Sequence, residues 1–183
     1  MNTLGPGSLT AILKVLLDIV AFILWVLLGG ASLIMVFIMV AGVYRTFGIG
    51  PELPQALLNF LQLGVVLALP MAITAIVVFT FVVDRLRRVC RTLVKGDPFV
   101  PENAGHLRSI AIAIAIYQLI RYAAHGAISL AYTLFGRPVE SGMNLEPHFT
   151  LNLGAWFAVI ALLVLSEVFR EGARLRDEQQ FTI

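Results

Sequence analysis

The sequence predicts an all-α integral membrane protein: a four-helix bundle with short cytoplasmic helical extensions, formed as a single membrane domain over residues 1–183. Two observations lead to this fold class. Of the 183 residues, 59% are hydrophobic and 13% are charged, whereas soluble domains average about 45–50% and 25%. The few charges are gathered in short stretches that separate four long apolar runs. A soluble domain of this size cannot bury so much apolar surface, so an ordinary soluble enzyme is excluded.

Each of the four apolar runs is long enough for a membrane helix, which needs about 20 mostly apolar residues. The first covers about 19–44 and the second about 57–83. The third, about 109–136, carries the single charge Arg121, and the fourth covers about 148–169. We therefore predict four membrane spans at these positions.

The third span contains alternating isoleucine and alanine over 110–116, a period of two that in water indicates a strand. Here the alternation is between large and small apolar side chains, with no polar face. An open strand in lipid would also leave its backbone groups unpaired. A helix is therefore predicted for this segment as well.

The basic residues predict how the spans are oriented. Ten of them lie in the N-terminal segment, between the second and third spans, or after the fourth span, whereas the two remaining loops hold only Arg45 and Arg137. Because cytoplasmic loops are enriched in Lys and Arg, we expect both termini and the central segment in the cytoplasm.

The central segment, about 84–108, is predicted to form a cytoplasmic helical hairpin. Apolar residues after Val83 keep helical spacing, so the second helix should continue about two or three turns beyond its span. Gly96 stands where a helix C-terminus favours glycine, and Pro101 suits the first turn of the next helix. The tail 170–183 should continue the fourth helix to about Glu178.

Two interpretations of this cytoplasmic face remain open. The arginines at 85, 87, 88 and 91 are either stop-transfer and headgroup-contacting charges or part of a docking surface for a soluble partner. The candidate partner surface comprises Arg87, Arg91, Asp97, Pro98, Phe99, Asn103, Gly172 and Phe181. Phe99 and the apolar end of the tail are either buried against their own chain or available to that partner.

A second candidate site lies inside the membrane around Arg121, because a charge near the middle of a span marks a pathway or a buried pair. Tyr117 and His125 lie one helical turn before and after it and share its face. The candidate acidic partners are Asp18 and Glu167, and Arg121 could extend toward Glu167. The alternatives are an arginine satisfied by Glu167 or by backbone carbonyls, and a ligand or ion site of a small channel or transporter subunit.

Other chemistry has little support in the sequence. No catalytic set of Ser, His and Asp and no HExxH spacing occurs, so we predict a non-enzymatic protein without a cofactor. The single cysteine, Cys90, allows no internal disulfide, and the three histidines do not have the spacing of metal ligands. A net charge of +2 does not indicate direct nucleic-acid contact. The lipid bilayer is the expected partner, and a homo-oligomer is left open.

Two runs resemble a known family. They are GDPFVPEN at 96–103 with Leu107-Arg108 behind it, and FREGARL at 169–175 followed by Glu178 and Thr182-Ile183. Both are similar to the small four-helix bacterial membrane family called domain of unknown function 2975. The resemblance implies four spans in the bacterial inner membrane, no established activity, and a frequent gene neighbour encoding a small helix-turn-helix regulator. On this basis we expect a membrane sensor or interaction protein whose cytoplasmic face engages such a transcriptional regulator.

Overall fold

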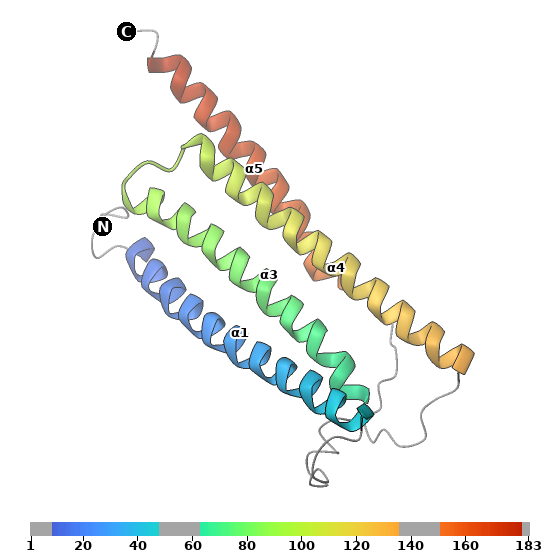
Figure 1. Cartoon of the computed structure of the whole chain (residues 1–183). Helices are drawn as coiled ribbons and strands as arrows, with labels where there is room; N and C mark the ends of the chain where they lie inside the picture. The colour runs from blue at the N-terminus through green and yellow to red at the C-terminus, as the bar shows by residue number, and fades with distance from the viewer. Residues whose placement is uncertain (1–8, 48–62, 136–150, 181–183) are drawn as a thin grey trace. The chain divides into compact units, whose positions relative to one another are not determined.

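The computed structural model describes residues 9–47, 63–135 and 151–180, which fold into four helices (Figure 1). The helices are α1 (Leu9–Phe47), α3 (Leu63–Val94), α4 (Pro101–Phe135) and α5 (Leu153–Gln180). The described ranges contain no strand, so the predicted all-α, four-helix class is confirmed. The predicted span residues 57–62, 136 and 148–150, and the candidate surface residue Phe181, lie outside these ranges.

Every helix contains a segment that is long and apolar enough to cross a membrane. These segments are Ile12–Tyr44, Ala68–Val94, Pro101–Leu130 and Leu153–Gln179. Most large apolar side chains along them are exposed, as expected for helices whose surroundings are lipid rather than water. The chain therefore has the features of a multi-pass membrane protein.

Two positions that favour a bend lie inside continuous helices. Helix α1 runs without a break through Gly29 and Gly30. Helix α3 continues through Pro70, where the hydroxyl of Thr74 donates a hydrogen bond of 2.7 Å to the Pro70 carbonyl. Threonine commonly makes such a bond to the carbonyl four residues before it in a helix, and the bond does not involve the Val66 carbonyl, which is the one that loses its amide donor at Pro70.

The chain divides into two compact units. The first comprises Met1–Trp25, Val78–Leu119 and Leu151–Ile183, and the second comprises Val26–Val77 and Ile120–Thr150. All of α5 and the connection between α3 and α4 belong to the first unit, which is therefore where the predicted hairpin and tail are found.

The first unit has a small apolar core. Leu17 and Ala21 of α1 pack with Val83 and Cys90 of α3. Its other buried apolar residues come from all but the first helix: Val89, Ala104, Leu107, Ile110, Ala111, Val159 and Ala173. In the second unit, Ile38 and Ala41 of α1 are buried.

The turn between α3 and α4 has the chemistry that its sequence predicts. The amide of Gly96 donates to the Leu93 carbonyl and the amide of Asp97 donates to the Thr92 carbonyl, both at 3.1 Å. This pair of bonds is the Schellman motif, which requires a residue in the left-handed region after the helix. Gly96 supplies it with a φ of 82°. Helix α3 thus ends at Val94, and Pro101 opens α4 as predicted.

Helix α5 begins at a side-chain cap. The Oδ1 atom of Asn152 accepts a hydrogen bond of 3.1 Å from the amide of Ala155, the usual contact of an N-cap residue. The helix then continues to Gln180, which confirms the predicted helical extension to about Glu178.

Candidate functional site

The loop between α3 and α4, residues 95–100, is held against α5. The rings of Phe99 and Phe169 have centroids 5.8 Å apart at an interplanar angle of 45°. The Phe99 ring also covers Gly172, where an added Cβ would lie 2.5 Å from its Cδ1 atom. Asp97 forms an ion pair with Arg176. The α3–α4 loop therefore rests on its own C-terminal helix, and Phe99 remains 42% exposed.

The buried side chain of Asn103 connects the two ends of the α3–α4 loop by hydrogen bonds. Its side chain is fully buried, and its Nδ2 atom donates to the hydroxyl of Thr92 at 2.7 Å and to the Pro98 carbonyl at 2.9 Å. The hydroxyl of Thr92 in turn donates to the Val89 carbonyl at 2.7 Å. One amide thus joins the end of α3, the loop and the start of α4.

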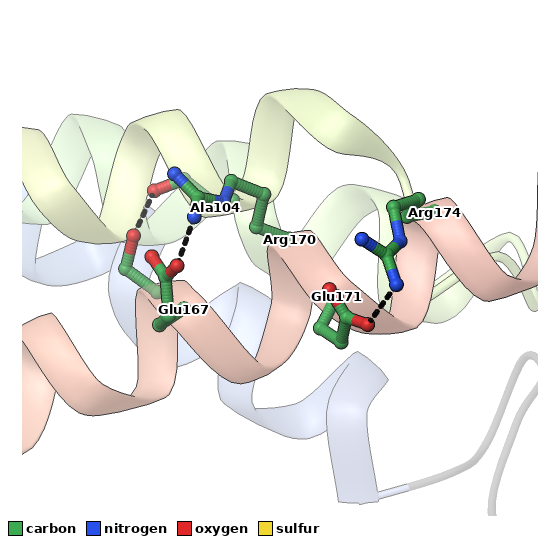
Figure 2. Close-up of polar contacts among 6 residues, drawn as sticks. Ala104, Glu167, Arg170, Glu171 and Arg174 are labelled. Atoms are coloured by element: carbon green, nitrogen blue, oxygen red, sulfur yellow. Dashed lines mark hydrogen bonds and ion pairs between the residues drawn. The ribbon is translucent and has the colours of Figure 1, made fainter.

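Helices α4 and α5 are joined by a buried hydroxyl. The Oγ atom of Ser166 donates to the Ala104 carbonyl at 2.9 Å, as Figure 2 shows. The same view shows two ion pairs along α5. Glu167 pairs with Arg170, and Glu171 pairs with Arg174 at 2.7 Å. These last two pairs join neighbours on one helix and leave α5 highly charged after Ser166.

Charged contacts also join the other neighbouring helices of the first unit. Arg87 Nε donates to Asp18 Oδ1 at 2.6 Å and connects α3 to α1. Arg85 Nη1 approaches His106 Nδ1 at 3.5 Å, and the Arg85 guanidinium lies 4.9 Å from the centre of the Phe81 ring. The first unit is therefore cross-linked by polar side chains from α1 to α5.

Most of the predicted partner surface serves these internal contacts. Arg87 pairs with Asp18, Asp97 pairs with Arg176, and Gly172 lies under the Phe99 ring. Asn103 has no exposed surface, and the Pro98 carbonyl accepts one of its hydrogen bonds. Of the described members, Arg91 and Phe99 are exposed. The composition of a docking surface stays a prediction, now centred on these two residues.

The three residues of the predicted intramembrane site that surround Arg121 all lie on α4. Tyr117, Arg121 and His125 are half-buried on the continuous helix α4, one turn apart along one face. The Arg121 guanidinium lies 5.4 Å from the centre of the Tyr122 ring. The ion pair that the structure gives Glu167 is with Arg170. Pairing of Arg121 with Glu167, and a ligand site around Arg121, stay predictions.

The structure also contains a groove that sequence reasoning missed. It has a volume of about 560 Å³ and lies between the first turns of α4 and the middle of α5. Its lining residues are Pro101, Ala104, Gly105, Arg108, Leu163, Ser166, Glu167 and Arg170. The small residue Ala104, whose carbonyl accepts the Ser166 bond, is of a type that allows two helices to approach closely, but the sequence does not say which helix comes close.

Metal chemistry finds no support in the part of the chain that the structure describes. No group of three or more His, Cys, Asp or Glu side chains could hold a metal ion there. Cys90 is a buried thiol in the core of the first unit. The polar groups described at this end of the first unit are mainly arginines and carboxylates.

Comparison with known proteins gives one match. The model of a family described as "Protein of unknown function (DUF2975)" matches residues 8–183. The match includes the two runs at 96–103 and 169–175. It also extends over α1, for which the resemblance noted from the sequence rested only on hydrophobicity and position. No curated protein and no solved structure matches the chain.

Proposed function

The chain belongs to the DUF2975 family of proteins of unknown function, and we propose that it is a non-enzymatic membrane sensor or interaction protein that engages a helix-turn-helix-type regulator. In this proposal the protein lies in the bacterial inner membrane, with both termini and the α3–α4 loop in the cytoplasm. The ten-to-two distribution of basic residues between the two sides supports this orientation.

The observation that carries the proposal is the attachment of the α3–α4 loop to α5. Phe99 packs on Phe169 and Gly172, and Asp97 pairs with Arg176. A connection that only joined two spans would not need contacts to a helix some 70 residues later. Fixing side chains before binding lowers the entropy cost of recognition, so a preorganised loop suits a docking role.

The exposed part of this structure defines the surface that we assign to the partner. Arg88 and Arg91 of α3 and Lys95, the first residue after it, are exposed, and the three follow one another at helical spacing. We call these three residues the basic stripe. Phe99 lies four residues after Lys95 in the sequence and is 42% exposed. Arginine and aromatic residues are enriched among the residues that dominate binding energy at interfaces. Because the basic stripe is positively charged, we expect the partner to present an acidic surface.

Co-purification in mild detergent tests the proposal. A tagged chain should retain a small soluble regulator, and the double reversal Arg91→Glu/Lys95→Glu should abolish the retention because like charges repel across an interface. The matched control is Arg108→Glu, which reverses an exposed charge in the α4–α5 groove and should leave retention unchanged. Membrane fractionation checks that all variants are inserted.

Three results would contradict the proposal. One is a wild-type chain that retains no soluble protein. Another is equal loss of retention in the stripe and groove variants, which would indicate a general charge effect. A retained partner that survives the double reversal would place the docking surface elsewhere.

A further inference from the structure

The lining of the groove between α4 and α5 combines apolar and charged residues. Ala104, Leu163 and Pro101 are apolar members of this lining. Arg108 reaches it from α4, and Glu167 and Arg170 reach it from α5. Its volume of about 560 Å³ falls within the range of small-molecule sites, about 300–1,000 Å³.

Two charged residues of the groove, Arg108 and Glu167, lie where the apolar runs of their helices end. Arg108 is the last charge before the uncharged stretch 109–120 of α4, and Glu167 is the first charge after the uncharged stretch 153–166 of α5. The hydrogen bond from Ser166 to Ala104 places the end of the α5 stretch beside Ala104, so the two uncharged stretches end at a similar level, within about one and a half helical turns of each other. In a membrane helix this level is the boundary between hydrocarbon and headgroups.

The charge balance of the groove favours an anion. Two arginines and one glutamate line it, which leaves one excess positive charge. The Glu167–Arg170 pair joins exposed neighbours on a single helix, and such exposed pairs contribute little to stability. An incoming phosphate can therefore recruit Arg170 at low cost while Arg108 binds it from the facing helix.

From these features we propose that the α4–α5 groove binds the phosphate headgroup of an anionic phospholipid. The two arginines hold the phosphate, and the first carbons of an acyl chain lie along Leu163 and the small residues of α4. Arginine suits this role because its planar guanidinium donates to phosphate oxygens in pairs. The groove is separate from the basic stripe, so the proposal goes beyond regulator binding.

Native mass spectrometry of the full chain tests the proposal. The protein is equilibrated with an equimolar mixture of phosphatidylglycerol and phosphatidylcholine, and the retained lipids are counted. The wild-type chain should retain phosphatidylglycerol in preference. Arg108→Gln should weaken this binding about five-fold, because a basic residue near an anionic headgroup contributes about that factor. The control variant Arg91→Gln, which changes the basic stripe, should leave the retention of phosphatidylglycerol unchanged.

A second pair of variants tests the groove rather than its charge. A Cβ at Gly105 or at Gly126, both on α4, would meet no atom within 4 Å. Gly105 lines the groove and Gly126 does not. Gly105→Leu should therefore fill the groove and abolish preferential retention, whereas Gly126→Leu should preserve it. Both changes raise helix propensity, and far-ultraviolet circular dichroism checks that the helices are retained.

A competition experiment with inorganic phosphate distinguishes a lipid site from a site for a free anion. Phosphate should neither displace the retained phosphatidylglycerol nor raise the unfolding temperature as that lipid does. The proposal is overturned if phosphate does either, if phosphatidylcholine is retained equally well, or if Arg108→Gln and Arg91→Gln reduce retention to the same extent.

Discussion

Gly172 determines where the side chain of Phe99 can lie. Because glycine has no Cβ, the Phe99 ring approaches the backbone of α5 so closely that an added Cβ would lie 2.5 Å from Cδ1 and 2.7 Å from Cε1. The same ring touches Phe169. The missing side chain at Gly172 thus allows the Phe99 ring to lie directly on the backbone of α5.

Replacing this glycine should destabilise the protein even though alanine favours helices. Gly172→Ala should lower stability by about 1 kcal/mol, since overpacking costs about 1–3 kcal/mol and helix propensity returns up to about 1 kcal/mol. Gly126→Ala, in open space on α4, should raise stability instead. Thermal unfolding in detergent measures both changes.

The Phe99 ring itself provides the control for this substitution. Gly172→Ala in a Phe99→Ala background should be neutral or stabilising, because the ring that meets the new methyl group is gone. An equal loss of stability in both backgrounds would contradict the contact as its cause.

The sequence predicts some residues of the site better than others, for a physical reason. The glycine at 96 and the proline at 101 follow from local backbone chemistry, and both were predicted. Asn103 was expected on a surface but is fully buried. Its side-chain amide donates to Thr92 and Pro98. These bonds require the start of α4 to pack against the end of α3, and no local sequence pattern predicts that packing.

At the scale of helices, length and apolar content predicted four elements, and the contacts between elements could not be predicted. The bonds Ser166–Ala104, Arg176–Asp97 and Arg87–Asp18 join residues 62, 79 and 69 positions apart. Each uses a residue type that occurs several times in the chain, so composition does not select the pair. The α4–α5 groove was missed for the same reason.

The ion pair between α1 and α3 should be stronger than a pair within one helix. The side chains of Arg87 and Asp18 are 26% and 38% exposed, whereas those of Arg88 and Asp84 are 52% and 46% exposed. A double-mutant cycle with alanine should give a coupling free energy of about 1–2 kcal/mol for the Asp18–Arg87 pair. The cycle for Asp84–Arg88 should give about 0.3–0.5 kcal/mol.

Denaturant titration in detergent gives the unfolding free energy of the four proteins in each cycle, and the coupling free energies follow from these values. Reversal of both charges, Asp18→Arg/Arg87→Asp, should recover part of the stability that either single change removes. Equal couplings in the two cycles would show that the interhelical pair is as well solvated as the local one.

For the whole molecule, the charge distribution makes a prediction about topology that cysteine labelling can check. Cys90 is 2% exposed and should not react, so the wild-type chain serves as the background. In intact cells an impermeant maleimide should label Ser141→Cys, which lies between the third and fourth predicted spans. It should not label Lys95→Cys or Glu178→Cys, both exposed positions, until the membrane is permeabilised.

Labelling of Lys95→Cys in intact cells would reverse the orientation and remove the regulator from reach of the basic stripe. Labelling of Lys95→Cys and Glu178→Cys on opposite sides would contradict an even number of spans between them. The Cys90-only chain controls for reaction at the buried thiol.

The long separation of the contacts around the α3–α4 loop has a consequence for biosynthesis. Asp97, Phe99 and Ala104 are translated before Arg176, Phe169 and Ser166, to which they bind. A nascent chain that has inserted α1, α3 and α4 therefore presents an unpaired carboxylate and an uncovered aromatic ring until α5 is made. The contacts of α5 with the α3–α4 loop and with α4 can therefore form only after residues 166–176 have been translated.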